Sequence, residues 1–183
     1  MMDNAPNTLE FRKASGEDIE AVSAIYDSVH DAEEAGITTS GWQRGIYPTR
    51  SSAEEALAAG DLFVATEKGT VVASARINRS QLDTYAKADW EYKADDSQVC
   101  VIHTLVVNPA CIGKGYGKAF MRFYEQYALA TACPFLRLDT DFRNRKARGL
   151  YASLGYKEVS VIPTFFQGEG LVDLVLLEKN LNA

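Results

Sequence analysis

Disulfide bonds and membrane-spanning segments are the first features that this sequence lacks. Its 183 residues include three cysteines, an odd number without the regular spacing of a disulfide framework, which argues against a small secreted scaffold. No stretch approaches the roughly 18 apolar residues that a spanning helix requires. The opening residues MMDNAPNTLEF are polar and acidic, whereas a signal peptide begins basic and becomes apolar. We therefore expect a cytoplasmic protein without a membrane partner.

An excess of basic residues is also missing. There are 19 Lys and Arg against 25 Asp and Glu, a net charge of −6. A phosphate backbone requires a basic face, so we expect no nucleic-acid partner, and a cationic small molecule suits this charge better. Repeats, low-complexity tracts and obvious linkers are absent, and 46% of the residues are hydrophobic. We expect one domain over residues 1–183 and no metal site.

The sequence does contain alternating strand and helix patterns. Ser15 has the character of a helix N-cap with Asp18 three residues on, and Ser51 and Ser52 open a second helix that Gly60 closes. A tight turn at 68–69 indicates a β-hairpin. The pattern is mixed α/β, with strands expected at 9–13, 62–67, 70–78, 99–107, 135–140, 156–162 and 170–178, and helices at 15–29, 51–60, 116–131 and 144–154.

Two segments depart from ordinary connections. The stretch VCVIHTLVV at 99–107 is nearly continuous in apolar residues, which indicates a strand buried on both faces. The polar segment at 80–98 is long for a compact domain, and such insertions are often functional.

Three glycines at alternate positions follow that buried strand, in CIGKGYGKAF at 111–120. Without Cβ atoms at Gly113, Gly115 and Gly117, successive backbone N–H groups can close on one anion, and the following helix directs its positive end there. A tight turn that needs positive φ angles explains the same glycines. Ile112 breaks the P-loop pattern and Phe120 breaks the dinucleotide fingerprint.

The loop instead resembles the central motif of the GNAT N-acetyltransferase superfamily, which VNPACIGKGYGKA at 107–119 follows. A second stretch, NRKARGLYASLGY at 144–156, resembles the family pattern N-x-x-A-x-x-L-Y-x-x-x-G-F/Y. The resemblance covers residues 99–156 by motif, and the flanking elements suit the same fold. One position departs, because Ile112 stands where the family usually has Arg or Gln, which removes a polar contact near the pyrophosphate.

The resemblance implies a single α/β (α+β) domain. Its twisted, mostly antiparallel sheet is flanked by helices and splays at the fourth and fifth strands, with acetyl-CoA in the cleft. An amine would attack the thioester directly, and a backbone N–H near Val106 or Val107 would hold the thioester oxygen. The implied cofactor-binding residues are Leu105, Val106, Val107, Ile112, Gly113, Lys114, Gly115, Tyr116, Gly117, Lys118, Asn144, Ala147 and Tyr151.

Candidate catalytic residues follow from the same comparison. Tyr151 occupies the position of the family's tyrosine acid, and a phenol of pKa about 10 stays protonated yet can give its proton to the CoA thiolate; helical spacing alone would make it a core aromatic. His103, with an ordinary pKa of about 6.5, could accept the proton of the amine, or it is a buried histidine held by a neighbour. Glu91 and Asp139 are alternative bases.

The acceptor side is the least defined. Trp42 and Tyr47 in the irregular segment after the first helix, and Trp90 in the long insertion, are the candidate substrate-binding residues, since such segments wall the acceptor pocket in the resembling family. Packing between loops explains them nearly as well. We expect a small-molecule or peptide amine as substrate, with a homodimer left open. The alternative function is a non-catalytic acyl-CoA-binding sensor on the same fold, which Ile112 favours and Tyr151 opposes.

Overall fold

Seven strands form one open sheet in the computed structural model, which describes residues 9–182. The spatial order is β1-β2-β3-β4-β5-β7-β6. The pair β4–β5 is parallel and the other neighbours are antiparallel, which confirms the mostly antiparallel sheet predicted from the sequence. The strands are β1 (Leu9–Lys13), β2 (Leu62–Glu67), β3 (Thr70–Asn78), β4 (Val99–Val107), β5 (Phe135–Asp141), β6 (Lys157–Phe166) and β7 (Gly170–Asn180).

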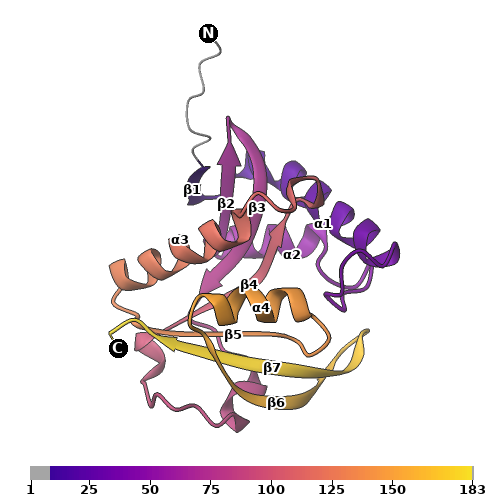
Figure 1. Ribbon diagram of the computed structural model, residues 1–183. Helices are drawn as coiled ribbons and strands as arrows, with labels where there is room; N and C mark the ends of the chain where they lie inside the picture. The colour runs from indigo at the N-terminus through magenta and orange to yellow at the C-terminus, as the bar shows by residue number, and fades with distance from the viewer. Residues whose placement is uncertain (1–8, 183) are drawn as a thin grey trace.

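Four helices cover the two faces of this sheet (Figure 1). Alternation along β2 sends Phe63 and Ala65 into a core with α3 and α4, while Leu62 and Val64 pack with α1 and α2 on the other face, as the period of two along a strand requires. The helices are α1 (Ile19–Glu34), α2 (Arg50–Ala58), α3 (Tyr116–Ala130) and α4 (Arg145–Ser153). Within residues 9–182, no helix is both long and apolar enough to cross a membrane.

Capping residues set the start of the first two helices. Ser15, predicted as the N-cap of the first helix, caps the 3₁₀ turn Gly16–Asp18, and its backbone N–H donates to Asp18 Oδ2 at 2.7 Å. The N-cap of α1 itself is Asp18. The start predicted for α2 was late. Thr49 is its N-cap, because the Thr49 hydroxyl accepts from the Ser52 N–H and the Ser52 hydroxyl accepts from the Thr49 N–H.

The long polar segment 80–98, which contains two short 3₁₀ turns, packs against strands β4, β7 and β6. Tyr85 and Trp90 are buried there against Val99 and Val101 of β4 and Leu176 of β7. The polar composition of the segment gave no indication that Tyr85 and Trp90 would be buried. The segment therefore completes a core, which is a packing role that a sequence pattern does not reveal.

Candidate functional site

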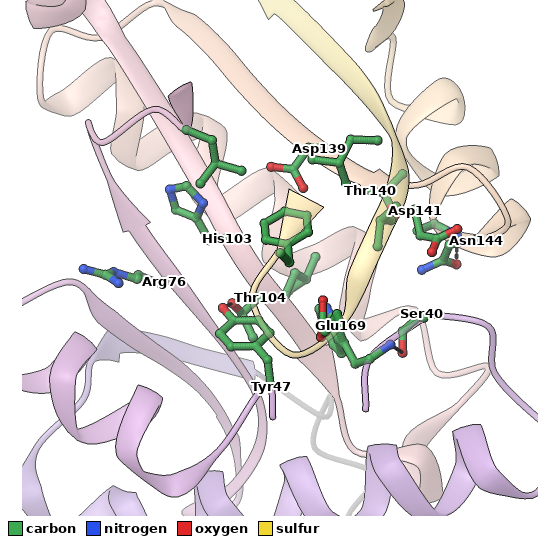
Figure 2. A pocket seen from close by; sticks show the side chains of 18 of the residues that line it. Ser40, Tyr47, Arg76, His103, Thr104, Asp139, Thr140, Asp141, Asn144 and Glu169 are labelled. Atoms are coloured by element: carbon green, nitrogen blue, oxygen red, sulfur yellow. Dashed lines mark hydrogen bonds between the residues drawn. The ribbon is translucent and has the colours of Figure 1, made fainter. Parts of the chain in front are cut away.

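The parallel strands β4 and β5 part after a short contact and leave a cavity between them. Their ladder joins Val99–Val101 to 135–137, and beyond it β4 continues beside β3 while β5 continues beside β7. The resulting cavity of about 480 Å³ lies in the size range of small-molecule sites. Figure 2 shows its polar side chains converging from β4, β5, the segment before α2 and the β6–β7 turn. Of the predicted residues, the lining includes Trp42, Tyr47, His103, Leu105, Asn144, Ala147 and Tyr151.

A β-bulge interrupts β4 at the edge of this cavity. Ser74 of β3 faces Val106 and Arg76 faces His103, so two residues of β4, Thr104 and Leu105, stand opposite one residue of β3. Thr104 has φ +52°, a backbone conformation that β-branched residues rarely adopt and that clusters at functional sites. A bulge disrupts the ladder locally, and Thr104 and Leu105 both line the cavity. The backbone N–H that would hold the thioester oxygen is predicted from the sequence near Val106 or Val107, one to three residues further along β4.

Thr104 is held by a residue from a distant segment. Its hydroxyl hydrogen-bonds to the Tyr47 hydroxyl, and burial raises the pKa of Tyr47 so that this phenol stays neutral. Tyr47 also packs edge-on against Trp42 at 6.0 Å between ring centroids. The segment before α2 thus supplies both a wall of the cavity and a contact to the bulge.

The glycine loop lies between β4 and α3. Gly113 and Gly115 have φ of +88° and +80°, and a Cβ atom at either would meet no atom within 4 Å. The Gly115 N-cap of α3 has no side-chain capping bond among the described residues, which leaves N–H groups of the first turn without intrahelical partners. The open space and the uncapped helix end together suit a phosphate group.

The third glycine of the loop serves close packing. A Cβ at Gly117 would lie 3.4 Å from Leu150 Cδ2 and 3.8 Å from Val107 Cγ2, so the missing side chain lets α3 approach α4 and β4. Ile112 is 46% exposed at the loop surface. Val106, by contrast, packs into the core formed with α1 and α2, so only its backbone could contribute to a site on the cavity side.

Tyr151 lies on α4 with its side chain 7% exposed and lining the cavity. Burial and, secondly, the nearby Asp139 carboxylate raise its pKa, so its hydroxyl stays protonated at neutral pH. Asn144 caps the same helix, its Oδ1 accepting from the Ala147 N–H at 3.1 Å. The cap fixes the first turn of α4 and thereby the position of the tyrosine two turns later.

His103 reaches the cavity but is a weaker base than its residue type suggests. Its Nε2 lies 3.1 Å from Asn78 Oδ1 and 3.2 Å from the Ser80 carbonyl oxygen. Because both partners are acceptors, Nε2 carries the hydrogen of the neutral ring. Burial and the charge of Arg76 lower the pKa of His103 to about 4. The ring is therefore neutral at physiological pH, and its protonated form is strongly disfavoured.

Asp139 is a cavity carboxylate held by a buried tyrosine. It lies on β5 and lines the cavity, and its Oδ2 accepts a hydrogen bond from the Tyr85 hydroxyl at 2.8 Å. Burial raises its pKa, which brings its basicity closer to that of an amine. The sequence had named it only as a rival to other bases.

Two predicted residues, Glu91 as a base and Trp90 as a substrate contact, are not among the described residues that line the cavity. The Glu91 carboxylate is exposed and pairs with Lys157 Nζ at 2.6 Å. Trp90 is 8% exposed, donates its indole N–H to the Tyr85 carbonyl at 2.8 Å and lies under the Arg137 guanidinium at 4.2 Å. Trp90 is therefore a structural anchor of the insertion.

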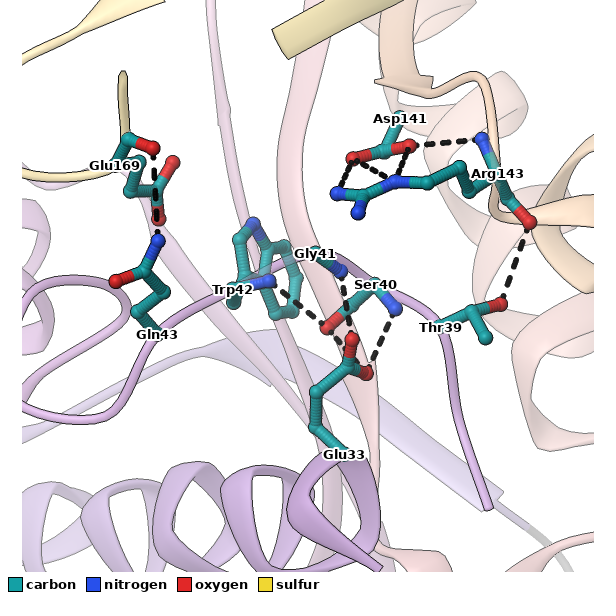
Figure 3. A network of polar contacts seen from close by, with 9 residues as sticks. All are labelled: Glu33, Thr39, Ser40, Gly41, Trp42, Gln43, Asp141, Arg143 and Glu169. Atoms are coloured by element: carbon teal, nitrogen blue, oxygen red, sulfur yellow. Dashed lines mark hydrogen bonds and ion pairs between the residues drawn. The ribbon is translucent and has the colours of Figure 1, made fainter. Parts of the chain in front are cut away.

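The segment that carries Trp42 is fixed by one carboxylate (Figure 3). Glu33 at the end of α1 accepts from the Ser40 N–H at 2.8 Å and from the Gly41 N–H at 2.9 Å. A Cβ at Gly41, which has φ +84°, would lie 2.4 Å from Asp141 Oδ2. Glycine at this position therefore lets the segment cross closely over the end of β5.

Thr104, Asp141 and Glu169 are among the cavity residues that sequence reasoning missed. Thr104 lies within the predicted strand 99–107 and looks like any other strand residue. Asp141 follows the predicted strand 135–140 and belongs to no recognised motif. Glu169 lies in the β6–β7 turn, 66 residues from His103 in sequence, and a polar residue in a turn carries no signal of a site. Their common position emerges from the tertiary fold.

Solved acetyltransferases share this fold. A GNAT-family acetyltransferase from Streptococcus agalactiae superposes with a TM-score of 0.78 at 18% identity, over 94% of this chain and 95% of that one. The Salmonella typhimurium protein yncA, solved with its cofactor acetyl-CoA, gives 0.68 at 18% identity, over 96% and 95% of the two chains. These likenesses show that the chain has the same fold as these solved acetyltransferases.

Sequence comparison assigns the family. The model of the Acetyltransferase (GNAT) family matches residues 23–156, more than half of the chain, and the chain belongs to this family. It is also 29% identical over 83 residues to an uncharacterized N-acetyltransferase of Methanocaldococcus jannaschii. That match covers 45% of this chain and 53% of the relative, so the chain spans about half the length of this curated relative.

Proposed function

We propose that this protein transfers the acetyl group of acetyl-CoA to a primary amine bound in the cavity between β4 and β5. The observation that carries the proposal is the meeting of three features in that cavity: the bulge at Thr104, the buried hydroxyl of Tyr151 and the carboxylate of Asp139. Each meets one requirement of acetyl transfer: the bulge a donor for the carbonyl oxygen, Tyr151 an acid for the thiolate, and Asp139 a base for the amine. Family membership supports acetyl transfer in general.

The residues present fit acetyl-CoA. Open space above Gly113 and Gly115 and the uncapped start of α3 would receive the pyrophosphate, with Lys114, Tyr116 and Lys118 beside it. Leu105 and Ala147 line the gap between the strands, where the pantetheine arm would lie. When bound, acetyl-CoA supplies an activated acetyl group and a thiolate leaving group. The backbone contacts need no side chain, so Ile112 does not oppose this fit.

The residues of the chain divide the proton transfers between them. An alkyl amine is mostly protonated at neutral pH, so Asp139 accepts a proton from it, with Tyr85 holding Oδ2 in place. The neutral nitrogen would bond to the acetyl carbon as the carbon–sulfur bond breaks, with a backbone N–H at residues 104–105 donating to the carbonyl oxygen. Tyr151 would give its proton to the departing sulfur, and the Tyr151 phenolate would take up the proton that the nitrogen loses on becoming an amide.

The test is acetyl-CoA turnover against a broad panel of primary amines, with release of the CoA thiol as the signal. We expect at least one amine to give turnover well above hydrolysis, and acetyl-CoA alone to raise the melting temperature. A thermal shift without turnover on any amine would contradict the proposal in favour of an acyl-CoA-binding sensor. Neither shift nor turnover would contradict both functions.

A further inference from the structure

Two carboxylates of the cavity have no cationic partner. Neither Asp139 nor Glu169 forms an ion pair with any residue between 9 and 182. Asp139 has the neutral Tyr85 hydroxyl on one oxygen. One oxygen of Glu169, Oε1, is buried and has no hydrogen-bond partner within the described residues. Both residues are half-buried, and a carboxylate removed from water is costly unless it is paired, so both are open to a cationic ligand.

The remaining charges of the cavity are balanced by the protein itself. Asp141 Oδ2 pairs with Arg143 Nη2 at 2.6 Å. Arg76 Nη2 lies 3.4 Å from Asp61 Oδ2, and in Figure 2 its guanidinium points away from Asp139 and Glu169. Apart from these two ion pairs, the charged side chains that line the cavity are the carboxylates of Asp139 and Glu169. The described lining therefore carries two unpaired negative charges and no unpaired positive charge.

The two carboxylates stand at separate places on the cavity wall. Asp139 comes from the middle of β5 and lies near Tyr151, whose pKa it raises, so it belongs to the reacting end. Glu169 comes from the β6–β7 turn, where its backbone carbonyl accepts from Gln43 Nε2 at 3.5 Å. Figure 2 shows their side chains apart from each other. Apolar side chains complete the lining, among them Ile46, Phe166, Val172 and Leu174.

We propose that the acceptor is an aliphatic dication, an amine that carries a second cationic nitrogen, with its reacting nitrogen at Asp139 and its second nitrogen at Glu169. This inference rests on the proposed function. The apolar lining contacts the methylene chain between the two nitrogens, and each nitrogen meets one carboxylate. A substrate with a carboxylate at its far end would instead place a negative charge beside Glu169.

The test compares three compounds of equal length with saturating acetyl-CoA: α,ω-diaminopentane, pentylamine and ω-aminopentanoate. A homologous diamine series from propane to octane finds the preferred spacing. Because hydrogen bonds to charged groups are worth more than neutral ones, we expect kcat/KM for the best diamine to exceed that of its monoamine by about tenfold or more, with the amino acid poorest. Glu169→Gln lowers this diamine-to-monoamine ratio toward one.

A matched control carries the same charge change away from the cavity. Glu10 is exposed on β1, and Glu10→Gln keeps the wild-type ratio. Calorimetric titration of the three compounds onto the protein with CoA repeats the comparison without turnover. Equal kcat/KM for diamine and monoamine, preference for the amino acid, or an unchanged ratio in Glu169→Gln overturns the inference while turnover upholds the proposed function. If none of the compounds is acetylated, the proposed function fails. The ratio of diamine affinity to monoamine affinity then tests by itself whether the cavity prefers a dication.

Discussion

At the scale of single residues, the hydroxyl of Tyr151 and the carboxylate of Asp139 influence each other. The negative charge of Asp139 adds to burial in raising the pKa of Tyr151, which keeps the phenol protonated but makes it a reluctant donor. A cation placed beside Asp139 offsets that charge and makes the proton easier to release. The acid therefore becomes more effective when the acceptor is present.

Replacing Tyr151 by phenylalanine removes the hydroxyl and keeps the buried ring. Because general acid catalysis is typically worth about 10²–10⁴ in rate, we expect kcat to fall within that range with a good amine. The thermal shift produced by acetyl-CoA should persist, since helix packing is unchanged. Steady-state kinetics and thermal denaturation measure the two effects, and full activity in Tyr151→Phe would mean that another group protonates the thiolate.

His103 makes a prediction about stability and pH. Its pKa of about 4 in the folded protein lies below the ordinary value of 6.5, so between these values the unfolded chain binds more protons and stability falls as the pH falls. The loss reaches about 3 kcal/mol by pH 4 and is absent above pH 6.5. We expect His103→Gln to lack this part of the acid destabilisation.

Denaturant unfolding of both proteins at several pH values measures that difference. The free energies of unfolding should change in parallel above pH 6.5 and converge, or cross, on acidification. Since the ring is already neutral near pH 7, His103→Gln should also leave the shape of the activity profile between pH 6.5 and 8 unaltered. If wild-type activity rose between pH 6.5 and 8 and His103→Gln abolished that rise, His103 would be the general base.

At the scale of elements, the glycine loop can be tested without straining its backbone. Asparagine tolerates positive φ better than other residues with a Cβ, so Gly115→Asn places a side chain in the open space where phosphate would bind. We expect the melting temperature without ligand to change little and the shift with acetyl-CoA to disappear. Gly36→Asn is the control, because Gly36 also has positive φ, +71°, and open surroundings.

The anchor of the segment 38–41 gives a second test at this scale. Glu33 accepts four hydrogen bonds, from the Thr38 hydroxyl, from both the N–H and the hydroxyl of Ser40, and from the Gly41 N–H. Glu33→Gln turns one acceptor into a donor facing these groups. We expect KM for the amine to rise several-fold while KM for acetyl-CoA is unchanged.

Glu20→Gln is the control for that variant, since Glu20 lies on the same helix and is exposed in a pair with Arg50. Surface pairs of this kind contribute little, so its kinetics should match the wild type. If KM for the amine were the same in Glu33→Gln as in the wild type, packing alone would hold the segment in position.

These elements also mark how far the sequence could lead. Periodicity and capping patterns predicted the strands and helices because those signals are local. The splayed sheet and the position of Tyr151 came from two motifs, since the motifs specify backbone and spacing. The sequence left open whether Trp90 in the insertion at 80–98 packs or binds substrate, because its burial depends on strands distant in sequence. Glu169 was missed because its position depends on a hairpin turn that meets the segment before α2.

At the scale of the whole molecule, the sheet consists of two smaller sheets. One contains β1 to β4 and the other β5, β7 and β6, and the ladder of Val99–Val101 against 135–137 joins them. Figure 1 shows the two parts diverging beneath α3 and α4. Domain stability therefore depends on helices that bridge both parts as well as on the strand ladder.

The divergence of β4 from β5 also creates two strand edges in the interior of the protein. Edges with unpaired backbone groups are templates for association with other chains, and here they are sheltered only while the two parts stay closed. A ligand seated between the strands would keep them closed. We expect acetyl-CoA to slow heat-induced aggregation, followed by light scattering below the melting temperature, more than it slows aggregation of Gly115→Asn. The gap that admits acetyl-CoA would then also make the protein's resistance to aggregation depend on the concentration of acetyl-CoA.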